Sequence, residues 1–193
     1  MALTRARPIA GDRRLAAKAR KIIDRVLARR RDQDALRHDV IEMRAMIEAE
    51  KGGEGAWNLK TAPGGLVDIE FIAQYLQLAH GATHPEIRST ETEAVLVAAA
   101  KAGLLPAAEA DILLPALRLH QALTQLLRLC VDGLFKPEEA PRGLLELLAR
   151  AGELPDFPTL DRHLRDTEAA VRASFERLIG PLAQAKPIKR TAD

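Results

Sequence analysis

Apolar residues recur along this chain at steps of three and four, the spacing that gathers them on one face of an α-helix. The first such segment spans about residues 12–30, and its apolar stripe consists of Leu15, Ala19, Ile22, Ile23, Val26 and Leu27. Leu and Ala, which favour helices, fill 63 of the 193 positions, whereas Val and Ile, which favour strands, fill only 18. The pattern therefore predicts an all-α fold and excludes a β-sandwich or β-barrel.

Cap and turn residues divide the chain into seven expected helices. They span about 12–30, a stretch ending near 51, 65–79, a stretch ending near 101, 106–132, 140–150 and 159–180. Asp32 or Asp34 is expected to cap the second helix, and Ser89 or Thr90 the fourth. Pro115, inside the fifth, predicts a kink or a break into two helices.

Most of the expected connections are short, which favours a bundle of about six to eight helices that are mostly antiparallel. We expect residues 1–182 to form a single helical domain and residues 183–193 to form a flexible C-terminal tail.

The charges are distributed unevenly. Residues 1–31 contain eleven Lys or Arg and two Asp, a local charge of +9, so the rest of the chain carries −7 within a net charge of +2. Such a basic segment could face nucleic acid, a nucleotide phosphate or an acidic neighbouring domain, or form a solvated helix face. Trp57 is the only aromatic residue among the first 60, so base stacking is poorly supplied and we expect no nucleic-acid binding.

The sequence shows little sign of metal, thiol or membrane chemistry. The single Cys130 excludes a disulfide scaffold and a multi-thiolate metal site, and its Leu-rich surroundings predict a buried thiol. His80 and His84 lie four apart, but Gly81 and Pro85 interrupt the helix that would align them, so no metal site is expected. The chain has neither a long apolar run nor a secretory signal, and we expect a cytoplasmic protein without a membrane span.

The most informative segment spans residues 60–78. On a helical wheel Asp68 falls on the apolar side, between Ile72 and Tyr75, in the first turn of the expected helix. A carboxylate there must be paired, hydrogen-bonded or directed into a cleft. Asp68 therefore either holds the preceding loop or belongs to a site. The polar face of this helix comprises Glu70, Gln74 and Gln77.

The loop before this helix also allows two interpretations. Gly64 and Gly65 permit positive φ angles and close approach of the backbone to another group. A helix N-terminus with free N–H groups binds anions, and Lys60 could add a positive charge for phosphate. The G-x-x-x-x-G-K-[ST] spacing of a Walker loop is absent.

Residues 60–78, KTAPGGLVDIEFIAQYLQL, closely resemble the K-x-x-x-G-G-L-x-D-I-E-F-x-x-Q-x-L-x-L signature of glutamine synthetase adenylyltransferases. Residues 2–12, ALTRARPIAGD, resemble the segment that follows the nucleotidyltransferase domain in that family. Residues 126–130 and the closing helix are similar to the end of its C-terminal half. A shorter Gly-Gly-Leu-x-Asp form also occurs in uridylyltransferases that act on the PII signal protein. Over about 1–180 the chain thus resembles the helical domain of the adenylylating half.

This resemblance implies a specific activity for the whole enzyme. Its C-terminal half transfers AMP from ATP to a tyrosine of glutamine synthetase with magnesium, and its N-terminal half removes AMP by phosphorolysis. PII proteins and glutamine set the balance. The implied partners are the chain's own nucleotidyltransferase domain, glutamine synthetase and PII. ATP and Mg²⁺ are implied for the full enzyme, and none is expected to bind this chain alone.

The family's catalytic motif, Gly-Ser-x-x-Asp-x-Asp, has no counterpart in this sequence. Asp32-Gln33-Asp34 has the D-x-D form, but it follows three arginines and lies between two expected helices rather than on a strand. Two-metal phosphoryl transfer needs those carboxylates. We therefore expect this chain to contain no catalytic residue and to be inactive alone.

The resemblance implies a helical accessory role, in which the chain completes or braces the nucleotide or protein-substrate cleft. The candidate residues near the cleft are Lys60, Gly64, Gly65, Asp68, Glu70, Arg5 and Arg7. Lys60, Arg5 and Arg7 would contact phosphate or brace the catalytic domain, and Asp68 and Glu70 would orient a basic side chain, a metal-bound water or the loop. Replacing Asp68 by Ala is then expected to reduce AMP transfer without unfolding the domain.

Three alternatives remain open at this point. The Lys60–Leu78 signature is equally compatible with an interdomain packing element. The chain is also compatible with a protein-interaction module of a PII uridylyltransferase-type regulator and, less so, with a nucleic-acid-binding helical domain.

Overall fold

The computed structural model describes residues 1–51 and 55–182, and within them it contains seven α-helices, three short 3-10 helices and no strand. The elements are η1 (Ala2–Arg5), α1 (Arg13–Leu27), α2 (Gln33–Lys51), α3 (Leu66–His80), η2 (Pro85–Ile87), α4 (Thr92–Lys101), α5 (Ala107–Cys130), η3 (Pro137–Glu139), α6 (Arg142–Ala151) and α7 (Phe157–Leu178). The expected all-α class is confirmed. The expected tail, 183–193, lies outside the described residues.

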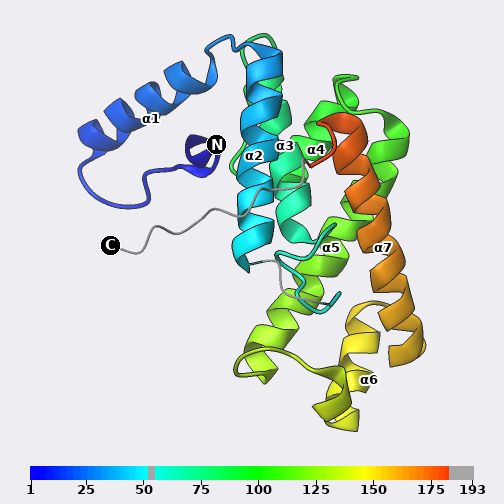
Figure 1. Cartoon of the computed structure of the whole chain (residues 1–193). Coiled ribbons are helices and arrows are strands. Elements are labelled where there is room, and N and C mark those ends of the chain that lie inside the picture. The colour runs from blue at the N-terminus through cyan, green and yellow to red at the C-terminus, as the bar shows by residue number, and fades with distance from the viewer. Residues whose placement is uncertain (52–54, 183–193) are drawn as a thin grey trace, which may run out of the picture.

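Helices α2, α3, α4, α5 and α7 pack side by side, and α6 covers the far end of α5 and α7 (Figure 1). Side-chain contacts fix the directions of neighbouring helices. Gln33 donates to the Ala79 carbonyl at one end of the α2–α3 pair and Arg44 donates to Asp68 at the other, so these helices are antiparallel.

Two apolar clusters form the interior. The larger one is centred on α3, whose Ile69 and Ile72 are fully buried among side chains of α2, α4, α5 and α7. The smaller one lies between α5, α6 and α7, and it includes Trp57, which stacks on Phe157 with 5.1 Å between ring centroids. Residues 55–65, the loop before α3, reach from the first cluster to the second. We call this loop the strap.

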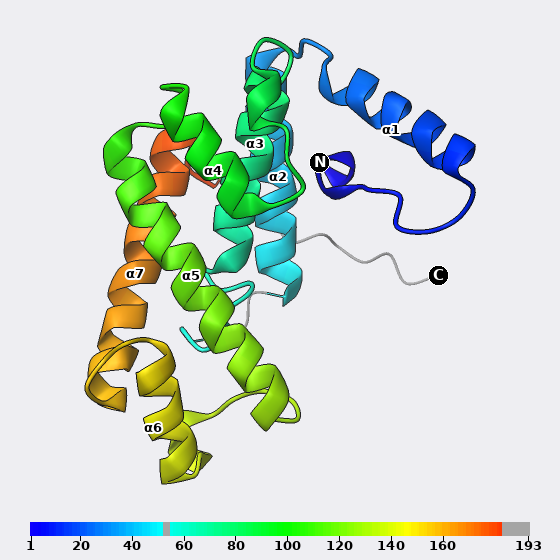
Figure 2. The same cartoon turned by 180° about the vertical axis from the view of Figure 1, so that it is seen from behind.

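Helix α1 stands apart from the bundle in both views (Figures 1 and 2). Asp12 caps it by accepting from the N–H groups of Arg14 and Leu15 at 2.9 Å. The predicted apolar stripe is present, but only its end is buried, because Leu15 and Ile22 remain 65% and 57% exposed. An amphipathic helix normally buries this face, so the exposed Leu15 and Ile22 give α1 an apolar surface beyond its contacts with η1 and, through Ile23 and Leu27, with the core.

The structure decides two local expectations, at Pro115 and at the cap of α2. Helix α5 is continuous through Pro115, so the expected break into two helices does not occur, because Leu113 and Leu117 on either side are fully buried and hold the helix in place. The expected cap of α2 is confirmed at Asp32, the first of the two candidates, whose Oδ1 accepts from the N–H of Ala35 at 2.8 Å.

Two further corrections concern a helix cap and the thiol. The N-cap of α4 is Glu91, later than predicted. Cys130 is exposed, not buried, and it is the last residue of α5. Among the described residues, no helix combines the length and the apolar character that crossing a bilayer requires.

Candidate functional site

The signature segment forms the strap and the first turns of α3, with Asp68 at its centre. Asp68 and Arg44 of α2 are both fully buried, and the Arg44 Nε donates to Asp68 Oδ1. Asp68 Oδ2 accepts from the Gly64 N–H at 2.7 Å and from Arg172 Nη1 of α7 at 3.2 Å. Of the two interpretations of this carboxylate, the geometry supports the one in which Asp68 holds the glycine loop.

The ion pair extends into a network that joins three helices and the strap. Arg44 Nη2 donates to the carbonyls of Thr61 and Ala62 at 3.3 and 3.2 Å. Glu48 Oε2 lies 3.0 Å from Arg44 Nη1 and 3.1 Å from Arg172 Nη1. Because each guanidinium has carboxylate partners, the network fixes the strap against α2, α3 and α7 and offers no free base.

Sequence reasoning missed Arg44, Glu48 and Arg172. A signal for Arg44 was present, since it lies four residues after the buried Val40 and three before Ile47 on the inner face of α2. No local signal marks Arg172 as its partner, because the two residues are far apart in sequence and meet only through the packing of α7.

The two glycines allow tight packing rather than the approach of a ligand. Gly64 has φ +78°, and a Cβ on it would lie 1.8 Å from the carbonyl oxygen of Glu168. A Cβ on Gly65 would lie 2.9 Å from the Leu59 carbonyl oxygen. Glycine is therefore required where the strap crosses α7.

The expected anion site at the start of α3 is not available. The four N–H groups of Gly65, Leu66, Val67 and Asp68 donate to the carbonyls of Ala62, Leu59, Lys60 and Gly65 at 2.9 to 3.0 Å. A helix N-terminus attracts phosphate through unpaired N–H groups. Here the turns of the strap already use them.

The remaining candidates lie nearer the surface. Arg5 of η1 and Glu70 of α3 form an ion pair at 2.6 Å, so the structure brings these two predicted residues together. Lys60 and Arg7 are exposed. Gln74 is half-buried, but Gln77 is only 2% exposed and accepts from the Ser89 N–H at 3.2 Å. The predicted polar face of α3 is therefore covered at Gln77 by the chain after η2.

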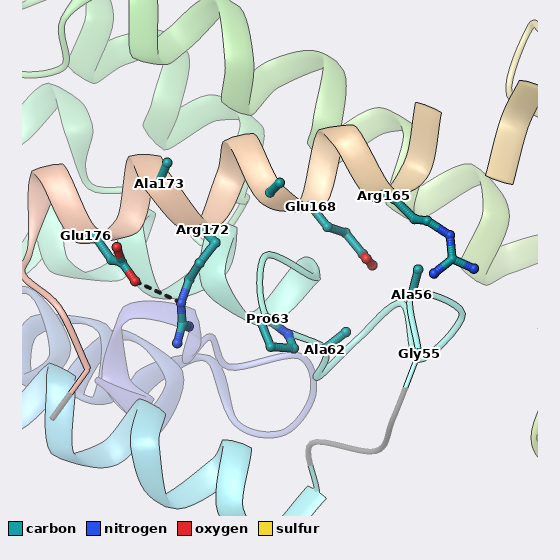
Figure 3. A pocket seen from close by; sticks show the side chains of 10 residues that line it. Gly55, Ala56, Ala62, Pro63, Arg165, Glu168, Arg172, Ala173 and Glu176 are labelled. Atoms are coloured by element: carbon teal, nitrogen blue, oxygen red, sulfur yellow. Dashed lines mark ion pairs between the residues drawn. The ribbon is translucent and has the colours of Figure 1, made fainter. Parts of the chain in front are cut away.

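A groove of about 600 Å³ follows the strap along α7 (Figure 3). From the strap it is lined by small uncharged residues, namely Gly55, Ala56, Ala62 and Pro63. From α7 it is lined by Arg165, Glu168, Ala169, Arg172, Ala173 and Glu176. Among the residues that the structure describes, no three His, Cys, Asp or Glu side chains gather closely enough to hold a metal ion.

Comparison with known proteins identifies the family. The family model described as GlnD PII-uridylyltransferase matches residues 41–179, which include α3, the strap and all the helices of the bundle after it. The chain belongs to this family.

Individual relatives carry the name of the adenylyltransferases that residues 60–78 resemble. The chain is 52% identical over 184 residues to the bifunctional glutamine synthetase adenylyltransferase/adenylyl-removing enzyme of Xanthobacter autotrophicus, an alignment that covers 95% of this chain and 19% of that protein. The enzymes of the same name from Rhodopseudomonas palustris HaA2 and Bradyrhizobium sp. BTAi1 are 51% and 50% identical over 93% of this chain and 18% of their own length. The predicted resemblance is confirmed, and the chain spans about a fifth of these relatives.

Proposed function

We propose that this chain is the helical accessory part of an enzyme that transfers AMP from ATP to a tyrosine of glutamine synthetase. The observation that carries the proposal is the identity of about half of the residues over nearly the whole chain to enzymes named for this activity. On this proposal ATP and Mg²⁺ are held by a nucleotidyltransferase domain outside this chain. The chain braces that domain and supplies no catalytic group.

The surface formed by η1 and α1 supports a role in docking. Residues 1–31 are strongly basic, and the apolar side chains of Leu15 and Ile22 are exposed on the same helix. Exposed apolar side chains with charged neighbours occur at protein interfaces. We propose that this surface contacts the nucleotidyltransferase domain of the same polypeptide. Arg7 in this N-terminal segment and Lys60 in the strap are the candidate phosphate contacts.

The further partners of the proposed enzyme are glutamine synthetase, as its protein substrate, and PII, as a regulator. We propose a cytoplasmic location, with which the single free thiol is compatible. No role in binding nucleic acid is proposed.

The decisive assay measures transfer of radiolabelled AMP to purified glutamine synthetase with ATP and Mg²⁺. The full-length enzyme that contains this region is compared with its Ile22→Glu variant and with a Leu134→Glu control, which places the same charge on an exposed leucine at the opposite end of the bundle. We expect Ile22→Glu to lower the rate at least tenfold and the control to leave it unchanged. Equal rates for Ile22→Glu and wild type would remove the docking role.

The isolated chain provides a second arm of this test, since we expect it to transfer no AMP. Magnesium-dependent transfer by the 193-residue chain would overturn the accessory assignment. The matching family model favours one alternative, a PII uridylyltransferase-type regulator. Transfer of UMP to PII by the full-length protein, without AMP transfer to glutamine synthetase, would decide for that alternative.

A further inference from the structure

A second pair of buried ionisable side chains lies beside the groove, separate from the Asp68 network. His120 of α5 is fully buried, and Glu168 of α7 is 6% exposed. His120 Nε2 and Glu168 Oε1 face each other at 3.7 Å, and neither atom has a hydrogen-bond partner. Buried polar atoms are almost always paired, so two such atoms facing each other require an explanation.

The contacts of His120 determine which of its nitrogen atoms carries hydrogen. His120 Nδ1 lies 2.9 Å from the carbonyl oxygen of Ala116, which can only accept, so Nδ1 is the donor. In the neutral ring Nε2 is then an acceptor. An ionised Glu168 would place a second acceptor opposite it. At 3.7 Å the two atoms are too far apart for a hydrogen bond, but a small rotation of the Glu168 side chain would bring them into range, and one proton between them would then satisfy both.

The surrounding charges do not provide another partner for Glu168 Oε1. On α7, Arg165 is held by Asp161 at 3.1 Å and Arg172 by Asp68 at 3.2 Å. The strap residues that line the groove are uncharged, and α5 contributes His120. Burial raises the pKa of the Glu168 carboxyl above its ordinary value of 4.5, although the nearby His120 and Arg165 oppose the shift.

We propose that Glu168 and His120 share a single proton, and that its loss loosens the strap from α7. In the protonated pair the Glu168 carboxyl O–H donates to His120 Nε2. When a base in solution takes this proton, the carboxylate faces a lone pair without a donor. It then turns into the groove, toward water and Arg165.

The position of Glu168 couples this turn to the strap. In Figure 3 the side chains of Glu168 and Ala56 point toward one another across the groove. The carbonyl of Glu168 is also where the strap packs most tightly, at Gly64. An outward turn of the carboxylate therefore displaces Ala56, the residue directly before Trp57, whose Nε1 donates to Asp161 at 2.8 Å.

The direction of the pH dependence follows from the raised pKa of Glu168. A carboxyl whose folded pKa exceeds its unfolded pKa stabilises the fold fully below the unfolded value, and this contribution is lost as pH rises through the folded value. The strap is thus held against α7 at lower pH, and it loosens as pH rises through the raised pKa of Glu168.

Trp57 is the only tryptophan and reports on the strap directly. The experiment measures quenching of its fluorescence by acrylamide between about pH 5 and pH 9 in the 193-residue chain. We expect quenching to rise with pH in the wild type. Glu168→Gln, whose amide donates to Nε2 at every pH, should abolish this rise, whereas Glu50→Gln, which removes an exposed carboxylate of α2, should retain it.

Quenching that is independent of pH in the wild type, or a rise that persists in Glu168→Gln, would overturn the proposal. A second measurement needs no variant and covers the case in which Glu168→Gln does not fold. Nitrogen-15 NMR of the imidazole should show neutral His120 with hydrogen on Nδ1, with the Nε2 resonance shifting as the shared proton is lost. An Nε2–H tautomer, or an Nε2 resonance that does not change with pH, would contradict the assignment.

Discussion

Replacement of Asp68 by Ala tests whether the central carboxylate of the signature holds the fold. The substitution leaves the fully buried Arg44 without its closest carboxylate and Gly64 with an unpaired N–H. Removing one partner of a buried ion pair typically costs about 3–5 kcal/mol, and a buried unpaired N–H costs about 1–3 kcal/mol. Glu48 still contacts Arg44 and offsets part of the cost of losing the Asp68 carboxylate, so the total is smaller than the sum of the two costs. We therefore expect a loss of about 4 kcal/mol in the free energy of unfolding.

This loss is large compared with the stability of about 5–15 kcal/mol that is usual for a domain. Urea denaturation of the 193-residue chain, followed by circular dichroism, measures it. With a slope of about 2 kcal/mol per molar, the midpoint should fall by about 2 M. The sequence alone led us to expect that Asp68→Ala would spare the fold. The buried network instead predicts that reduced AMP transfer in the full enzyme would accompany this instability.

Two further variants make the reasoning refutable. Glu70→Ala, on the same helix, breaks only the partly exposed pair with Arg5 and should cost less than about 1 kcal/mol. The double variant Arg44→Met, Asp68→Leu removes both charges and should be more stable than Asp68→Ala. A midpoint for Asp68→Ala close to that of Glu70→Ala, or a double variant no more stable than the single one, would refute the role assigned to the pair.

Gly64→Ala should lower the melting temperature by several degrees, because its Cβ would overlap the Glu168 carbonyl oxygen at 1.8 Å; Gly143→Ala on α6, with open space around the new Cβ, should not lower it. The Arg177 guanidinium lowers the pKa of Glu109 below its ordinary value of 4.5. The contribution of this pair to stability is therefore present above pH 4.5 and lost as pH falls through the lowered value. Glu109→Gln should lower the free energy of unfolding by about 1 kcal/mol at neutral pH. In thermal melts the variant should also lose less stability than the wild type as pH is lowered below 4.5. An equal loss in both proteins would contradict the pairing.

The helices were predictable because their cause is local. The spacing of apolar residues, the cap at Asp12 and the breaks at Gly81 and Gly180 determine where most helices begin and end without reference to the rest of the fold. The errors arose where a distant contact outweighed the local signal. Pro115 is tolerated because its neighbours are buried against other helices.

The candidate site was predictable only in part, for the same reason. The helical wheel identified Asp68 as a carboxylate that needs an ion-pair or hydrogen-bond partner. Its position was compatible both with holding the preceding loop and with belonging to a site. Its partners Arg44 and Arg172 come from α2 and α7, and the N–H groups of α3 that could have bound phosphate are used by turns of the strap. Long-range packing, which leaves no periodic trace in a sequence, decided between the two.

The sequence by itself determined that this chain is helical, that it has a basic N-terminal segment and that residues 60–78 resemble the signature of glutamine synthetase adenylyltransferases. These properties depend only on residue type and spacing, so they can be read from a segment of the sequence without knowing what it contacts in the fold. The tertiary structure decided that Asp68 is a buried anchor, that Leu15 and Ile22 of α1 stay exposed and that His120 faces Glu168. Each of these depends on which helices lie side by side, because burial and electrostatic pairing are properties of neighbours in space.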